Sequence, residues 1–285
     1  MTYKREITQD SYQKFDRSVS LICWAYNEEA LIGEFLEKAT ELMDATIQDY
    51  EIILIDDAST DKTYEIAESF RMKNNRLIIF RNKHNLNVGL SSQRAIQMAS
   101  KEYLFWQTID WSYDISHLRE FLNYLKTFDI VQGVRRKPVV VKVKFLKPIV
   151  AFLKIFGTKH LVMRSDTVIK AIISVINYVM IRMLFNIPLS DFQNVTFYKT
   201  KWIQSIKYEA NSSFVNPEGL IKAYWRGLSI KEVQINFIPR EKGEAKGTKV
   251  RSIINSVKDI LRLWFQWVIL NKRDYIRKGI IVRNN

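Results

Sequence analysis

The stretch from Tyr103 to His117, Y-L-F-W-Q-T-I-D-W-S-Y-D-I-S-H, predicts both how the chain folds and where it binds a ligand. It opens with an apolar run up to Trp106, which is typical of a buried strand, and continues into two carboxylates, Asp110 and Asp114. Open α/β sheets bind ligands at the carboxyl edge, where such a strand end puts its negative charge. A carboxylate that faces a polyphosphate there favours a divalent cation between the two groups. The alternative is that Asp110 only ends the strand and Asp114 caps the next helix.

Two earlier apolar runs also end in polar residues. The run 19–24 leads into A-Y-N-E-E (25–29), where Asn27 is expected to cap a helix, and the run 50–55 leads into D-D-A-S-T-D (56–61). Helical patterns follow both, and a third run, 77–80, precedes another helix. Strands that alternate with helices predict an α/β fold with a mostly parallel central sheet covered on both faces. Three polar strand ends on one sheet edge are harder to explain by helix capping than one.

Composition restricts the class of partner. The chain has 285 residues, enough for one large α/β domain with an appendage, and its formal net charge is +14. Such an excess favours a polyanion. In the segments 135–160 and 251–273 the basic residues alternate with bulky apolar ones, which indicates an anionic membrane surface rather than a nucleic acid. The most apolar window, 168–189, is interrupted by charges and a proline, so we expect it to lie at the interface rather than span the membrane.

Phosphate binding by a glycine-rich backbone loop is not indicated. The chain contains neither G-x-G-x-x-G nor G-x-x-x-x-G-K-[ST], and it has nine glycines in all. A metal and basic side chains must therefore hold any phosphate. Oxygen ligands without a cysteine or histidine cluster favour a hard cation, Mg²⁺ or Mn²⁺, over zinc.

These motifs together resemble family 2 glycosyltransferases with the GT-A fold. The resemblance covers roughly residues 18–250 and rests on A-Y-N-E (25–28), I-D-D-A-S-T-D-K-T (55–63), N-V-G (87–89) and the acidic segment. The arrangement is most similar to the polyprenyl-phosphate sugar transferases, such as dolichyl-phosphate mannosyltransferase. F-I-P-R-E-K-G-E-A-K (237–246) resembles the F-x-x-R-x-x-G-x-S-K loop of that subgroup, with Ala245 where serine is usual.

The resemblance implies roles for particular residues. Asp110 aligns with the second, metal-binding acid of the family's D-x-D motif, whereas Thr108 stands where the first acid would be. Loss of one carboxylate should weaken metal affinity. The residues implied to line the nucleotide or cofactor site are Ala25, Tyr26, Glu28, Asp57, Thr108 and Asp110.

The acceptor of the transferred sugar needs binding residues of its own. A polyprenyl phosphate is already ionised near neutral pH and needs cations rather than a base. The candidates are Arg135, Arg136, Arg164, Arg240 and Lys246, of which Arg240 and Lys246 lie in the resembling loop. Asp191 could orient the acceptor or act as a general base for a hydroxyl, and it could equally be a turn residue. The candidates for catalysis are thus Asp110, Asp191, Arg240 and Lys246.

The expected function is that of an inverting glycosyltransferase for the synthesis of cell-envelope glycans. It would move a sugar from a nucleotide diphosphate to a polyprenyl phosphate, as a peripheral protein at the cytoplasmic face of the cell membrane. Transfer to a hydroxyl of a glycan or lipid-linked oligosaccharide, or a non-catalytic relative that binds nucleotide sugars, are the alternatives. The sequence leaves the sugar, the nucleotide base and the oligomeric state open, a homo-oligomer included.

The expected organisation has three parts. Residues 1–17 form an N-terminal arm, residues 18–250 the catalytic domain with an interfacial helical insertion at about 138–188, and residues 251–285 an amphipathic helical tail. Trp264 and Trp267 of that tail suit a membrane interface, whereas packing in the core or in a dimer is the alternative.

Overall fold

The described part of the chain folds around one mixed, mostly parallel sheet of eight strands. The computed structural model describes residues 13–135, 168–238, 240, 250–273 and 278–283. The strand order is β3-β2-β1-β4-β6-β5-β7-β8, and all neighbours are parallel except β6, which runs antiparallel to β4 and β5. The strands are β1 (Val19–Ala25), β2 (Tyr50–Asp56), β3 (Leu77–Arg81), β4 (Tyr103–Trp106), β5 (Ile130–Arg135), β6 (Thr196–Lys199), β7 (Ser229–Ile235) and β8 (Ile280–Arg283).

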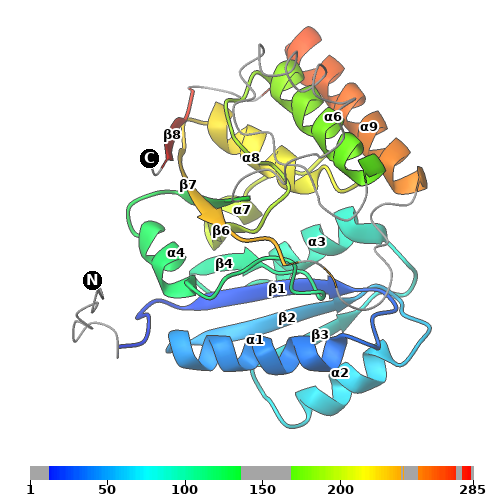
Figure 1. Cartoon of the computed structure of the whole chain (residues 1–285), viewed down its shortest axis with the longest axis vertical. Coiled ribbons are helices and arrows are strands. Elements are labelled where there is room, and N and C mark those ends of the chain that lie inside the picture. Colours follow the sequence, from blue (N-terminus) through cyan, green and yellow to red (C-terminus); the bar gives the residue numbers. More distant parts are fainter. Residues whose placement is uncertain (1–12, 136–167, 239, 241–249, 274–277, 284–285) are drawn as a thin grey trace.

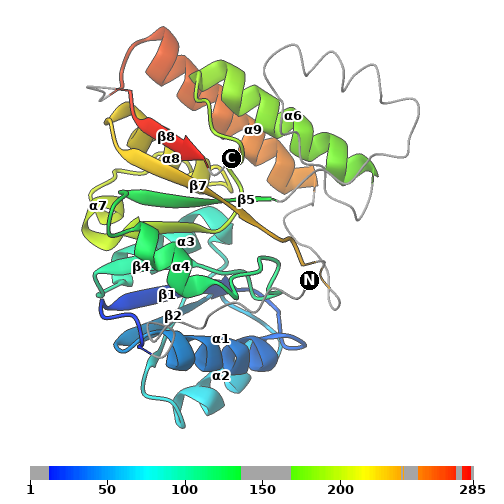
Figure 2. The same cartoon turned by 60° about the vertical axis from the view of Figure 1, so that its left-hand side comes forward.

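Helices cover both faces of this sheet (Figures 1 and 2). On one face α1 (Ile32–Thr46), α2 (Thr63–Arg71) and α4 (Leu118–Tyr124) pack in one hydrophobic cluster. The helices that contribute to the cluster on the opposite face are α3 (Asn87–Met98), α6 (Val168–Phe185), α7 (Thr200–Gln204), α8 (Val215–Trp225) and α9 (Val250–Trp264). Helices α6 and α9 lie side by side in both views. A short π-helix, Phe265–Ile269, continues α9.

Burial on both faces explains the apolar strand sequences. Every residue of β2 is buried, as is every residue of β1 except the half-buried Trp24. A parallel sheet covered on both sides needs such continuous apolar runs instead of alternation. The predicted α/β fold with a mostly parallel sheet is therefore confirmed, and the apolar run Tyr103–Trp106 is β4.

The prediction that Asn27 caps a helix is wrong. Helix α1 begins at Ile32, and Asn27 has a left-handed backbone with φ of 51°. Asn27 instead joins two strand-end loops, because its Oδ1 accepts a hydrogen bond of 2.8 Å from the backbone N–H of Thr60. Asparagine tolerates this backbone region better than most residues. Asn27 therefore forms part of a turn and not the N-cap of the helix.

The C-terminal segment contains more than the predicted helix. After α9 and the π-helix, the chain returns to the sheet, where β8 pairs in parallel with β7. Trp267, expected at a membrane interface, is 2% exposed, and its indole donates a 3.0 Å hydrogen bond to Oε1 of Glu209. An exposed apolar row is formed by three residues at four-residue intervals, Leu261, Phe265 and Ile269. Within the described ranges, no helix has the length and apolarity needed to cross a membrane.

The N-V-G motif has a packing role at the start of α3. A Cβ on Gly89 would lie 2.2 Å from the carbonyl oxygen of Asn211 and 2.7 Å from that of Ser212. Both obstacles are backbone atoms, so the contact cannot be relieved by a side-chain rotation. Glycine at position 89 therefore lets α3 approach the loop that precedes α8.

This close approach predicts a stability difference between two glycines. Gly89→Ala should lower the free energy of unfolding by about 1–3 kcal/mol, the usual range for overpacking a filled interior. Gly33→Ala in α1 is the matched control, because its Cβ would meet Ile66 at an ordinary 3.7 Å. Denaturant unfolding of the three proteins measures the difference. Equal midpoints for the two variants would contradict the packing role.

Candidate active site at the carboxyl ends of the parallel strands

One cavity of about 610 Å³ opens at the carboxyl ends of β1 and β4 and extends beneath α6 and α9. It brings together most of the residues that the sequence singled out, from segments that are more than 200 positions apart in the chain. Those that line it are Ala25, Tyr26, Glu28, Asp57, Thr108, Asp110, Arg135 and Arg240. Asp191 does not line the cavity, and Lys246, Arg136 and Arg164 lie outside the described residues, as does the part of the expected interfacial insertion before residue 168.

Asp57 is held in place by the neighbouring strand ends. Its backbone N–H donates a 2.8 Å hydrogen bond to the carbonyl of Ala25, which links the ends of β2 and β1. Its carboxylate Oδ1 accepts from Nδ2 of Asn82 at 2.7 Å and from the backbone N–H of Leu86 at 2.8 Å. Both hydrogen bonds use Oδ1, so the buried carboxylate can turn Oδ2 towards a ligand.

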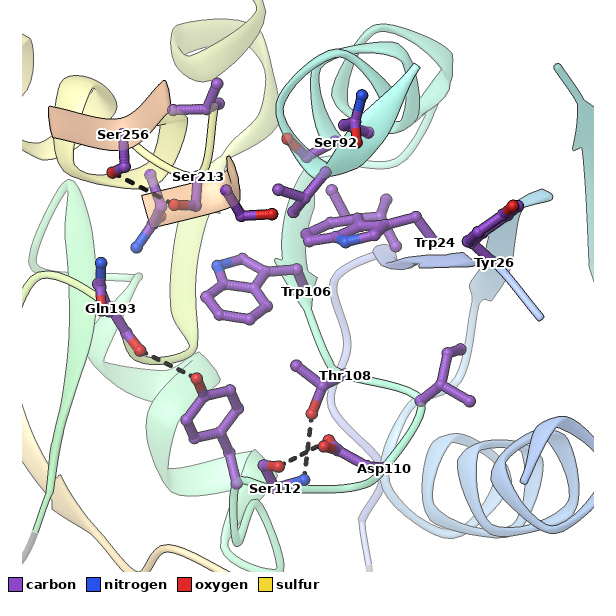
Figure 3. Close-up of a pocket in the computed structure, with 18 of the residues that line it drawn as sticks. Trp24, Tyr26, Ser92, Trp106, Thr108, Asp110, Ser112, Gln193, Ser213 and Ser256 are labelled. Carbon is purple, nitrogen blue, oxygen red and sulfur yellow. Dashed lines mark hydrogen bonds between the residues drawn. The ribbon is translucent and has the colours of Figure 1, made fainter. Parts of the chain in front are cut away.

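Asp110 sits in a tight turn after β4. Its Oδ1 accepts a 2.6 Å hydrogen bond from the hydroxyl of Ser112, whose backbone N–H donates to Oγ1 of Thr108 at 3.1 Å (Figure 3). The next residue, Trp111, has a left-handed backbone with φ of 51°. Such a conformation in a bulky residue is found where surrounding structure enforces it, commonly at functional sites. Thr108 thus supports the turn that positions Asp110.

Arg240 provides positive charge at this edge. Its guanidinium forms an ion pair with the carboxylate of Glu28, and its Nη1 lies 3.7 Å from Oδ2 of Asp110. These three side chains are only 12–15% exposed, so water screens their interactions weakly. Arg240, one of the two cations predicted from this part of the sequence, therefore lies at the strand ends.

Asp191 has a different environment from the one a general base requires. It is 3% exposed and forms a bidentate ion pair with Arg135, at 2.9 Å from Nε and 3.2 Å from Nη2. Burial raises the pKa of Asp191, but the charge and hydrogen bonds of Arg135 outweigh it, so the pKa lies below its ordinary value. The carboxylate orients Arg135, which does line the cavity.

Aromatic residues form a part of the site that sequence reasoning missed. Trp24 and Trp106 are the half-buried residues near the ends of β1 and β4, and both line the cavity (Figure 3). The signal in the sequence is a tryptophan near the end of each apolar run, just before the polar cluster. This pattern alone does not indicate a site, because an aromatic residue in a strand is most often a core residue.

A divalent cation fits the donor set at Asp110. Among the described residues there is no cluster of three or more His, Cys, Asp or Glu that could bind a metal ion through protein ligands alone. Mg²⁺ is commonly bound by one or two carboxylates together with the phosphates of a substrate, and Asp110 offers one carboxylate at the rim of the cavity. The arrangement suits a cation that arrives with a diphosphate and not a metal held by protein ligands alone.

Comparison with known families agrees with this site. The family model described as glycosyl transferase family 2 matches residues 20–183, more than half of the chain. The chain therefore belongs to glycosyltransferase family 2.

Individual relatives are distant. The glycosyltransferase AglD of Haloferax volcanii is 24% identical over 274 residues, which are 93% of this chain and 40% of AglD. The poly(ribitol-phosphate) beta-glucosyltransferase of Bacillus spizizenii is 32% identical over 111 residues, 38% of this chain and 17% of that protein. The chain thus spans less than half the length of either relative.

Solved structures share the GT-A fold. The mannosyltransferase PcManGT of Pyrobaculum calidifontis, solved with GDP-Man and Mn²⁺, has a TM-score of 0.57 at 12% identity, over 90% of this chain and 69% of that one. Glucosyl-3-phosphoglycerate synthase of Mycobacterium tuberculosis, solved with Mn²⁺, UDP and glucosyl-3-phosphoglycerate, has a TM-score of 0.54 at 14% identity, over 86% of this chain and 80% of that one.

The Asp191–Arg135 pair predicts how stability depends on pH. A lowered carboxyl pKa contributes stability that is fully present above the unfolded value of about 4 and is lost as pH falls through the lower folded value. Asp191→Asn should cost about 3–5 kcal/mol near pH 7, because Arg135 is left buried without its partner. The difference from wild type should shrink below about pH 4. Denaturant unfolding across this range measures it, and a difference independent of pH would contradict the assignment.

Proposed function

We propose that this enzyme is an inverting glycosyltransferase that moves a sugar from a nucleotide diphosphate to a polyprenyl phosphate at a membrane surface. The observation that carries the proposal is the course of the cavity. It runs from the carboxylates at the strand ends to a roof formed by α6 and α9, where Ile176 both lines the cavity and is 56% exposed. An acceptor with an apolar chain could enter past that residue and present its head group to the charged end.

The donor would bind at the ends of β1, β2 and β4. Asp57, fixed through Oδ1, would accept a hydrogen bond from the nucleoside with Oδ2. Ala25 and Tyr26 line the same part of the cavity, next to Asp57. The diphosphate would then lie between Asp110 and Arg240, whose guanidinium supplies charge-assisted hydrogen bonds to phosphate oxygens.

Arg135 would bind the acceptor phosphate. Its bidentate contact with Asp191 fixes the guanidinium, so its remaining N–H groups are oriented before any ligand arrives. A paired acid with a lowered pKa is a weak base, which disfavours a hydroxyl acceptor activated by Asp191. A phosphate acceptor needs no such base, because its oxygen is already ionised.

The reaction then balances without transfer of a proton. An acceptor phosphate oxygen forms a bond to the anomeric carbon as the bond from that carbon to the diphosphate breaks on the opposite side, and the nucleotide diphosphate leaves with the electron pair. A Mg²⁺ or Mn²⁺ ion at Asp110 would neutralise the charge that develops on the diphosphate. Arg240 would add positive charge beside it, and the half-buried position of these groups strengthens both effects.

The outer surface of the roof supports a peripheral location at the cytoplasmic face of the membrane. Besides the apolar row of α9 and the π-helix, α6 exposes Ile176 and Met183 at 56% each. Exposed basic residues, Lys258 and Arg262, accompany this row on α9. A helix with apolar residues flanked by cations suits an anionic lipid surface.

Replacement of Asp110 tests the chemistry. Asp110→Asn should lower the rate of transfer at least about 100-fold, because a preorganised charge at the leaving group is lost. Asp114→Asn is the matched control four residues later; Asp114 lies outside the cavity and bonds to Ser116 and Asn236. Glycolipid formation from a labelled nucleotide sugar, Mn²⁺ and a polyprenyl phosphate measures the rate. Unchanged turnover in Asp110→Asn would refute its role.

Membrane attachment is tested on the exposed row. The double variant Phe265→Ser with Ile269→Ser should reduce flotation with anionic liposomes several-fold, because about 1.5–3 kcal/mol per large apolar side chain depends on its burial. Met72→Ser is the control, since Met72 is 74% exposed and directly follows α2, a helix that lies far from α9 in Figure 1. Equal flotation of wild type and the double variant would exclude this surface.

A further inference from the structure

Helix α9 has two sides with different surroundings. Its inner side lines the cavity through four residues, Ser252, Ile253, Ser256 and Val257. Its outer side, continued by the π-helix, exposes the apolar row that begins at Leu261. One helix therefore contacts both the ligand cavity and the surface that is proposed to face lipid, and the contacts that hold this helix in place affect both.

Asp259 attaches α9 to the loop that precedes α8. Its Oδ2 accepts hydrogen bonds from the backbone N–H groups of Asn211 and Ser212, both at 3.0 Å. Its Oδ1 accepts from Nη2 of Arg262 at 2.9 Å, and the same nitrogen donates to the carbonyl of Glu209 at 2.7 Å. The loop is thus fixed to α9 at three of its residues.

The charge of Asp259 strengthens this attachment. The side chain is only 13% exposed, and burial raises its pKa, but the hydrogen bonds from Arg262 and the loop outweigh burial and hold the pKa below its ordinary value. The carboxylate is therefore ionised near neutral pH. Hydrogen bonds to an ionised acceptor are roughly twice as strong as those between neutral groups.

The opposite side of the same loop holds the start of α3. Gly89 packs so closely there that a Cβ would lie 2.2 Å from the carbonyl oxygen of Asn211, and Nε2 of Gln93 donates to the carbonyl of Ala210 at 2.7 Å. The backbone N–H groups of the loop thus bond to α9, whereas its carbonyls face α3. A shift of α9 would move this loop against backbone atoms of α3, so the two helices are joined through it.

The start of α3 belongs to the donor side of the cavity. Asn85, Asn87 and Val88 line the cavity, and the backbone N–H of Leu86 donates to Oδ1 of Asp57 at 2.8 Å. Asp57 is the carboxylate that would bind the nucleoside. A continuous series of contacts therefore runs from α9 through the loop and α3 to the nucleotide end of the site.

A lipid surface favours the docked position of α9. In that position α9 lies beside α6, which exposes Ile176 and Met183, so the two helices can contact lipid together (Figure 1). Undocking would remove three buried apolar side chains from the core, Ile260, Leu263 and Trp267. A nucleotide also needs α9 docked, because α3 is then held beside Asp57. Two ligands that favour the same conformation strengthen each other's binding by the same factor.

We propose that Asp259 is a positioning residue for donor binding, through which attachment of α9 to an anionic lipid surface raises the affinity of the enzyme for its nucleotide. Asp259 does not line the cavity, so it acts through the loop and α3. The inference rests on the proposed function, because it needs both a nucleotide ligand and a membrane surface. It gives the membrane helix a part in donor binding in addition to attachment.

Equilibrium dialysis tests the coupling. Labelled UDP and GDP are dialysed with Mg²⁺ against the protein alone, with phosphatidylcholine liposomes, or with liposomes that contain phosphatidylglycerol, and chambers with liposomes alone correct for adsorption to lipid. The anionic liposomes should tighten the binding of at least one nucleotide about fivefold or more, and the neutral ones less. That nucleotide should in turn strengthen the binding of the protein to liposomes by the same factor.

Asp259→Ala should lose this gain and still bind liposomes, because the apolar row is intact. Asp259→Asn keeps an acceptor oxygen for the two N–H groups and should retain part of the gain. Gly89→Ala disturbs the loop from the side of α3 and should also lose the gain. Asn255→Ala is the matched control, at an exposed position one turn earlier in α9, and should retain all of it.

Two further measurements separate positioning from general destabilisation. Circular dichroism and thermal unfolding establish that each variant is folded, and Asp259→Asn and Gly89→Ala keep the test decisive if Asp259→Ala unfolds. In transfer assays with liposomes, Asp259→Ala should raise KM for the nucleotide sugar and leave kcat nearly unchanged, because Asp259 affects donor binding and contacts no reacting group.

The outcomes distinguish the inference from the proposed function. If wild type binds neither nucleotide under any of these conditions, the proposed function fails and the inference with it. If wild type binds a nucleotide but no anionic liposomes, the membrane location fails and the coupling is overturned. If it binds both, but lipid leaves nucleotide affinity unchanged or weakens it, or if Asp259→Ala keeps the gain, the positioning role is overturned while the proposed function stands.

Discussion

The Arg240 guanidinium lies between the carboxylates of Glu28 and Asp110, and the charged part of the site depends on that contact. Parallel strands bring their carboxyl ends to one edge, so the acids that follow β1, β2 and β4 gather around one cavity. Like charges in a half-buried place repel one another, and a cation must offset the repulsion. Arg240 supplies one positive charge, and a divalent cation at Asp110 would supply more.

The cavity is divided into regions with different chemistry. Charged residues lie at the rim, where a diphosphate and a phosphate acceptor would meet, whereas the floor between β1 and β4 is aromatic and neutral. Helices α6 and α9 close the top and expose apolar residues on their outer side. The same two helices can therefore shape the inner cavity and contact a lipid surface. Trp267 shows this division in the C-terminal segment: it is buried against Glu209, while Phe265, two residues earlier, faces outward.

The strands that precede the site could be predicted almost residue by residue, because burial on both faces requires long apolar runs that end abruptly in polar residues. Prediction failed where a residue serves a contact distant in sequence. Asn27 resembles a helix cap but bonds to Thr60. Asp191 accepts a hydrogen bond from the backbone N–H of Gln193, as expected of a turn residue, but its ion pair with Arg135, 56 positions away, has no signal in the sequence. β8 is short and joins the edge of the sheet after a helix, so its pattern carried little signal.

The amino-acid sequence by itself determined the alternation of strands and helices, the acids that end three strands, and membership of family 2. These features depend on local hydrophobicity and on motifs that are contiguous in the chain. Tertiary structure alone decided that Arg240 reaches Glu28 and Asp110. It also decided that Arg135 forms an ion pair with Asp191 and that the rings of Trp24 and Trp106 lie side by side in the cavity. The physical reason is that these contacts join side chains on different strands and loops, whose distances are set by the register of the sheet and the packing of helices upon it.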